Sequence, residues 1–194
     1  MQGVICHSVE KALLLHDFIH HPSYAMTTPA TAPLDDALIV PPPLPAALAQ
    51  CIDAYDALTG GTLSTDTMQR LSTEQLTLFA YHIVRREVMQ GGFIQLIYNG
   101  YGPFIFLNHF ARVLREWGMT DLATLINKAR KHFQRYHKQI AAADTDDDLM
   151  ALYEQMPQFD ECDDTFVDCE EDFTRQLEQY VAQHSDSFTP QQQP

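Results

Sequence analysis

The sequence predicts an all-α fold: a single multi-helix domain preceded by an irregular, proline-rich N-terminal arm. Three observations support this prediction. Apolar residues recur every three or four positions from residue 45 onward, which is the period of a helix. Ser72-Thr-Glu-Gln75 has the pattern of a capping box, in which the serine and glutamine side chains bond the exposed amides of a helix start. No stretch of useful length alternates with the two-residue period of a strand.

Residues 1–43 are predicted to contain one amphipathic helix, Val9–Ile19, followed by an extended arm over 21–43. Proline lacks a backbone N–H donor and breaks regular elements. The arm contains Pro22, Pro29, Pro33 and Pro41-Pro42-Pro43. The helical domain is expected to span 44–186, and residues 187–194 are expected to form a disordered tail.

Glycines, prolines and capping residues divide the domain into helices. Pro45 suits a first helical turn, and Thr120 suits an N-cap. Gly60-Gly61, Gly91-Gly92 and Gly118 mark helix ends. The helices expected from these signals start at Pro45, run from Ser72 to about Met89, and cover Phe93–Tyr98, Phe104–Trp117 and Asp121–Ile140.

The C-terminal region has an apolar stripe at helical spacing. The stripe predicts a helix, continuous or broken once, in which the two cysteines are core residues rather than metal ligands. Its members are Phe159, Cys162, Phe166, Cys169, Phe173, Leu177 and Tyr180.

The last 51 residues carry the whole net charge of −14. Residues 144–194 contain 15 acidic residues and one basic residue, whereas residues 1–143 contain 11 of each. A dense anionic surface repels nucleic acid and attracts basic surfaces. We therefore expect this protein to bind a basic protein rather than to bind nucleic acid directly.

Eight of the 13 residues from Asp160 to Asp172 are acidic. On a helix, Asp160, Asp164 and Asp168 stack with a rise of about 6 Å between neighbours. Phosphates of one DNA strand advance by about 3.4 Å per step, so this ladder has the right order of spacing to imitate a phosphate row. The candidate partner-binding residues are Asp144, Asp146, Asp147, Asp148, Asp160, Glu161, Asp163, Asp164, Asp168, Glu170, Glu171 and Asp172.

Two plainer interpretations of these acids remain open. They could form a solvated face that keeps the protein soluble. They could also pack beside residues 112–138, whose local charge is +5, within one chain or across a dimer.

Motifs for metal binding and catalysis are incomplete. Asp144-x-Asp146-x-Asp148 begins like a calcium loop, but Leu149 occupies the glycine position and Gln155 the glutamate position. The chain has no HExxH, GxSxG or P-loop motif. No metal, cofactor or enzymatic activity is therefore expected. The lack of a membrane-spanning run and of a secretory pattern predicts a cytoplasmic protein with reduced cysteines.

The most specific string in the chain is Glu87-Val-Met-Gln-Gly-Gly-Phe-Ile-Gln-Leu-Ile-Tyr-Asn99-Gly100. It resembles the signature of a bacterial family of DNA-mimic proteins. The family pattern is a helix end started by a glutamate, an Asn-Gly-Gly-Phe-like turn, and then Gln and Asn a few residues on. Gln90 stands where the family has the first asparagine. The resemblance extends from about Leu71 to His184.

The resemblance implies an all-helical domain, often a homodimer, without a cofactor. It also implies an acidic surface that imitates DNA and occupies the binding face of a helix-turn-helix regulator. We interpret the motif itself as structural: Gly91 and Gly92 for a tight turn and Phe93 for the core. Gln95 and Asn99 are expected to bond the turn backbone, and Glu87 belongs to the same motif.

The leading hypothesis is a non-enzymatic acidic protein that binds a basic DNA-binding protein, such as a transcriptional regulator, in competition with DNA. One alternative is an enzyme or immunity-type accessory protein with a site around Glu87, Gln95 and Asn99. The other is a helical domain whose acidity serves only solubility.

Overall fold

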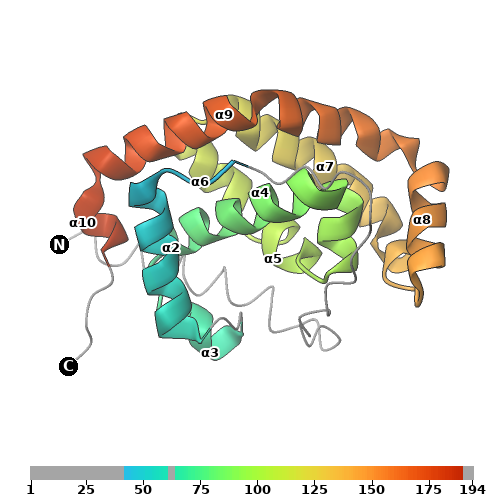
Figure 1. Cartoon of the computed structure of the whole chain (residues 1–194), viewed down its shortest axis with the longest axis horizontal. Helices are drawn as coiled ribbons and strands as arrows, with labels where there is room; N and C mark the ends of the chain where they lie inside the picture. The colour runs from blue at the N-terminus through green and yellow to red at the C-terminus, as the bar shows by residue number, and fades with distance from the viewer. Residues whose placement is uncertain (1–41, 61–63, 190–194) are drawn as a thin grey trace.

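The computed structural model describes residues 42–60 and 64–189, and over these residues the predicted all-α single domain is confirmed (Figure 1). None of the helices in this part of the chain combines the length and apolar character needed to cross a membrane. In chain order the elements are α2 (Ala46–Thr59), α3 (Thr65–Met68), α4 (Thr73–Tyr98), α5 (Gly102–Phe106), α6 (Phe110–Glu116), α7 (Thr120–Ile140), α8 (Asp146–Gln155), the 3-10 turn η1 (Pro157–Phe159), α9 (Asp160–Gln183) and α10 (Ser185–Phe188).

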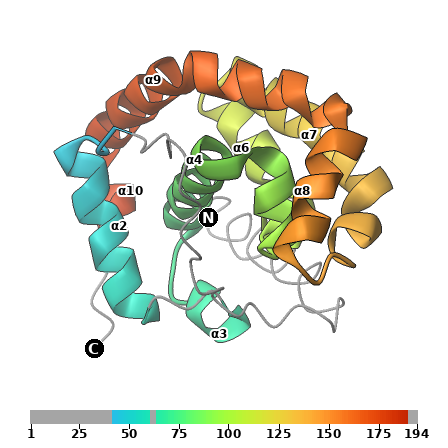
Figure 2. The ribbon, with the colours of Figure 1, turned by 45° about the vertical axis from the view of Figure 1, so that its right-hand side comes forward.

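Helix α4 is the centre of the domain and packs against α2, α5, α6, α7 and α9. Helix α9 lies along the outer edge, over α4 and beside α7, in both views (Figures 1 and 2). Helix α8 is set at an angle beyond the first residues of α9. The predicted helix Val9–Ile19 and the arm as far as residue 41 lie outside the described residues.

Predicted helix-end signals are confirmed at Ser72 and Gly60. Ser72 Oγ accepts from the Gln75 N–H at 3.2 Å, and Gln75 Oε1 accepts from the Ser72 N–H at 2.9 Å, so the capping box starts α4. Gly60 adopts a left-handed conformation with φ of 66° and ends α2. Pro45 directly precedes α2, and its carbonyl accepts from the Ala49 N–H.

The structure corrects two expectations about helix bounds. The predicted helix Phe104–Trp117 is two helices, α5 and α6, because the Asn108 side chain replaces the helical bonds between them. Its amide nitrogen donates to the Phe104 carbonyl, and its oxygen accepts from the Phe110 N–H. Asparagine competes with the helix backbone in this way. Thr120 is the first residue of α7 rather than its N-cap, which is Met119.

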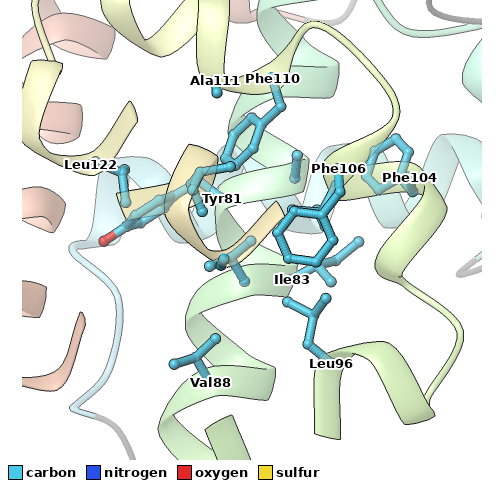
Figure 3. Packing of buried hydrophobic residues seen from close by; sticks show 14 of the residues in the cluster. Tyr81, Ile83, Val88, Leu96, Phe104, Phe106, Phe110, Ala111 and Leu122 are labelled. Atoms are coloured by element: carbon cyan, nitrogen blue, oxygen red, sulfur yellow. The ribbon is translucent and has the colours of Figure 1, made fainter. Parts of the chain in front are cut away.

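The core forms where side chains of α4 meet those of α5, α6 and α7 (Figure 3). Tyr81 of α4 lies near Leu122 of α7, and Phe106 of α5 packs above Ile83 of α4. Phe93, just after the glycine pair, is fully buried and contacts the ring of Phe106. The glycine interruption of α4 therefore turns a large aromatic side chain into the core.

The apolar stripe of α9 faces this core, as predicted. Phe166, Phe173 and Leu177 are buried, and Cys169 is half-buried. Cys162 is fully buried, and this burial raises the pKa of its thiol to about 11. Cys162 therefore stays protonated and behaves as a small apolar residue.

The C-terminal end is packed further along than predicted. Phe188, expected in a disordered tail, is buried against Trp117 and Tyr180. Its carbonyl accepts a 2.7 Å hydrogen bond from the buried Tyr55 hydroxyl of α2. The packing of Phe188 and its hydrogen bond with Tyr55 thus extend the domain to Thr189. Residues 190–194 lie outside the described part.

Replacing Phe188 with alanine is expected to lower the free energy of unfolding by about 3–5 kcal/mol, because it empties a closed aromatic site. Urea denaturation measures this change. Val167→Ala is the control, because Val167 is 41% exposed on α9 and such surface changes stay within about 0.5 kcal/mol. Equal effects of the two substitutions would contradict the anchoring role of Phe188.

Candidate functional site

The outward side of α9 presents a continuous anionic surface, which we call the α9 acidic face. It faces away from α4 and α7, because the buried stripe occupies the opposite side of the helix. Its six members are exposed: Asp160, Glu161, Asp164, Asp168, Glu171 and Asp172.

Two members of the α9 acidic face are partly neutralised within the chain. Glu161 pairs with Lys128 of α7 at 2.5 Å, and Asp172 pairs with Arg175 at 2.5 Å. These pairs are solvent-exposed, so each contributes little to stability. The other four members have no ion pair within the part of the chain that the structure describes. They are Asp160, Asp164, Asp168 and Glu171.

Helix α7 does not neutralise the rest of the face. It packs beside α9, but Lys131, Arg135 and Lys138 are exposed and form no ion pair with α9 among the described residues. Pairing between the basic helix and the acidic helix is therefore limited to Lys128 and Glu161 in this part of the chain.

Glu170 does not belong to the surface, although it was a candidate partner-binding residue. It is 3% exposed and accepts from Arg85 Nε of α4 and, at 2.6 Å, from the Thr174 hydroxyl. Thr174 is also within 2.7 Å of the buried Tyr81 hydroxyl. Glu170 thus forms part of a buried polar network that joins α9 to α4.

Asp163 is also drawn inward. Its Oδ1 accepts from the Phe93 N–H at 2.8 Å, directly beneath the glycine interruption of α4. Desolvation raises the pKa of Asp163 to about 7; the Phe93 N–H opposes this shift, and the charges of Asp160 and Asp164 add to it. Asp163 therefore holds α9 against α4 and is only partly charged near neutral pH.

The candidate acids before α9 lie around the start of α8. Asp144, Asp147 and Asp148 are exposed. Asp148 accepts from the Thr145 N–H and hydroxyl and forms a capping box, and the hydroxyl hydrogen bond holds its pKa below the usual range. Asp146 is the first residue of α8, and its side chain is outside the described part. Acids at this position are stabilised by the helix dipole.

The interruption of α4 requires glycine. Gly92 has φ of 71° and ψ of −174°, a backbone region essentially restricted to glycine. A Cβ atom on Gly92 would also lie 2.4 Å from Asp163 Oδ2. The predicted tight turn is therefore confirmed, and its close contact is with α9.

Glu87 joins the two halves of the kinked helix. It is 3% exposed and accepts from Arg86 at 2.7 Å, from Asn99 at 2.7 Å and from Gln95 at 3.5 Å. The expectation that Gln95 and Asn99 bond the turn backbone is therefore wrong, because both amides point to the Glu87 carboxylate. The cluster satisfies a buried charge, which is a structural use of these residues. Among residues 42–60 and 64–189, no three His, Cys, Asp or Glu side chains converge as metal ligands.

Substituting alanine for Gly92 should destabilise the domain by at least about 1–3 kcal/mol, because it adds backbone strain and a clash with Asp163. Gly60→Ala is the matched control, since Gly60 also has positive φ but a Cβ there meets nothing within 4 Å. Chemical denaturation compares the two. A cost at Gly92 no larger than that at Gly60 would show that the α4–α9 contact is loose.

Asp163 is expected to make stability depend on pH. Its pKa is 3.8 in its ordinary state and about 7 in the folded protein. The folded state therefore binds the proton more tightly, so this contribution to stability is complete at low pH and lost as pH rises through 7. Asp163→Asn removes the charge and keeps an acceptor for Phe93. The free energy of unfolding of Asp163→Asn, relative to that of wild type, should therefore increase as the pH is raised from about 5 to about 8. Parallel pH profiles of the two proteins would disprove the assignment.

The kink, the Glu87 cluster and the α9 acidic face all lie in a part of the chain that is similar to known proteins. The family model described as DMP19-like protein matches residues 69–184. The chain is also 31% identical over 138 residues to the DNA mimic protein DMP19 of Neisseria meningitidis serogroup B. That alignment covers 71% of this chain and 83% of the relative. These matches show that the chain belongs to the family of DMP19-like proteins.

Proposed function

We propose that this protein acts as a DNA mimic, whose α9 acidic face occupies the DNA-binding surface of a basic protein in competition with DNA. The observation that carries this proposal is the row of exposed carboxylates on the outer edge of the domain, Asp160, Asp164, Asp168 and Glu171, which form no ion pair with the described residues. The name of the 31%-identical relative supports the same role.

The spacing of these carboxylates suits a surface that normally meets phosphates. Residues four apart on a helix rise by about 6 Å. Phosphates on one DNA strand advance by about 3.4 Å per step, so Asp160, Asp164 and Asp168 correspond to roughly every second phosphate. Arginine and lysine side chains that contact a DNA backbone are long enough to adjust to this difference.

The row is held on a rigid support. The opposite side of α9 is buried against α4 and α7, and Glu170 and Asp163 fix its position by internal hydrogen bonds. A preorganised charge row loses little conformational entropy on binding, and this favours affinity. Because the attraction is between exposed charges, binding should weaken strongly as salt is added.

The partner that this surface fits is a basic DNA-binding protein, such as a helix-turn-helix transcriptional regulator. Asp144, Asp147 and Asp148 add negative charge beyond the start of α9 and would extend the contact. The cytoplasm is the compartment in which such a partner works. Homodimer formation stays a prediction.

Reversing charge at Asp160, Asp164 and Asp168 together to lysine is expected to abolish partner binding and leave the fold intact. The fold should survive because all three side chains are exposed. Circular dichroism checks that it does. The matched control reverses Asp66, Asp121 and Asp186, which are also exposed but lie on other helices. Equal loss of binding in the control would mean that net charge, rather than the α9 acidic face, attracts the partner.

A pull-down from native lysate at low salt identifies the partner. Protein released by added duplex DNA, before any increase in salt, should consist of basic DNA-binding proteins. Each is then purified and tested for direct competition between this protein and its DNA. Failure of DNA to displace any captured protein would refute the mimic role.

A further inference from the structure

A cleft of about 290 Å³ lies between α2 and α4, where Pro42, Pro43 and Leu44 lead into the domain. Helices α2 and α4 lie side by side there (Figure 2). The volume is close to the lower end of the range of small-molecule sites. The cleft has apolar walls and four ionisable side chains: Asp53 from α2 and His82, Arg85 and Arg86 from α4.

His82 is one of the residues that line this cleft. Its Nδ1 is buried and has no hydrogen-bond partner in the described part of the chain. Leaving a buried polar atom unpaired costs about 1–3 kcal/mol, and native proteins rarely do so. Burial, together with Arg86 and Arg85, lowers the pKa of His82 to about 4, so the imidazole is neutral at neutral pH.

The two guanidinium groups each retain unused donors. Arg85 donates through Nε to Glu170 and through Nη2 to the Pro42 carbonyl. Arg86 donates through Nε and Nη2 to Glu87, and Nη2 also reaches the Tyr101 hydroxyl. In both arginines, Nη1 has no hydrogen bond to the described residues. Planar guanidinium donors of this kind suit a carboxylate.

The balance of charge around the cleft selects the class of ligand. Arg85 and Arg86 are already paired with Glu170 and Glu87. Asp53 is exposed and has no ion pair within the described residues. The site is therefore slightly negative, which disfavours a simple anion. A molecule with a carboxylate for the arginines and an ammonium group for Asp53 satisfies both signs.

We propose that this cleft binds an apolar α-amino acid. The carboxylate is held by the free donors of Arg85 and Arg86, the ammonium group by Asp53, and the apolar side chain by Ile52 and Pro42. Arg85 also bonds Glu170 of α9, so the cleft and the acidic helix share a residue. The proposal is independent of the mimic function, because none of its contacts uses the α9 acidic face.

Isothermal titration calorimetry on the full chain tests the proposal with L-leucine, L-methionine and L-phenylalanine. At least one should bind at millimolar concentration. 4-Methylpentanoate is leucine without the ammonium group, and isopentylamine is leucine without the carboxylate group. Each should bind on the order of tenfold more weakly than leucine or worse, because one charged partner is left unpaired. If none of the three amino acids binds, or if 4-methylpentanoate binds as tightly as leucine, the proposal is overturned.

Variants locate the binding in the cleft. Asp53→Asn is expected to weaken binding of the amino acid on the order of tenfold and to keep the fold, because Asp53 is exposed. Asp66→Asn, an exposed acid of α3 outside the cleft, is the matched control and should bind as wild type. Unchanged affinity in Asp53→Asn would overturn the proposed site.

Discussion

The burial of one side of α9 is the constraint on which the rest of the structure depends. The outer side of this helix carries like charges four residues apart, and each such pair costs roughly 0.2–0.5 kcal/mol. Each fully buried aromatic or leucine side chain contributes about 1.5–3 kcal/mol. Phe166 and Leu177 are fully buried on the inner side. Packing therefore outweighs repulsion, and a helix that would be unfavourable in isolation becomes a stable carrier of charge.

Buried polar groups then determine where α9 lies. The Arg85–Glu170 pair and the hydrogen bond from the Phe93 N–H to Asp163 both connect it to α4. Removing one partner of a buried charge pair is strongly destabilising, because it leaves the other charge buried and uncompensated. Gly92 allows the second contact, because any side chain there would displace the Asp163 carboxylate. The glycine kink of α4 therefore determines how closely α9 packs against α4.

The acids of the C-terminal region consequently have different roles that their sequence does not distinguish. Asp163 and Glu170 serve the interior. Glu161 and Asp172 have cationic neighbours, and Asp148 caps a helix. The remaining four carboxylates of the α9 acidic face form no ion pair among the described residues. The cleft between α2 and α4 is a separate feature, and no sequence motif indicated the residues that line it. Arg85 lines the cleft and also belongs to the buried polar network beneath α9.

The sequence by itself determined the helical class, the capping box at Ser72, the glycine interruption of α4 and the apolar side of α9. These features depend on local spacing and backbone preference, which neighbouring residues decide. Only the tertiary structure decided that Glu170 is buried, that Gln95 and Asn99 turn to Glu87, and that Phe188 belongs to the core. Each depends on a side chain far away in the sequence, or on which side of a helix is covered. Charge and periodicity give the same signal for a carboxylate that faces water and for one that faces an arginine across the core.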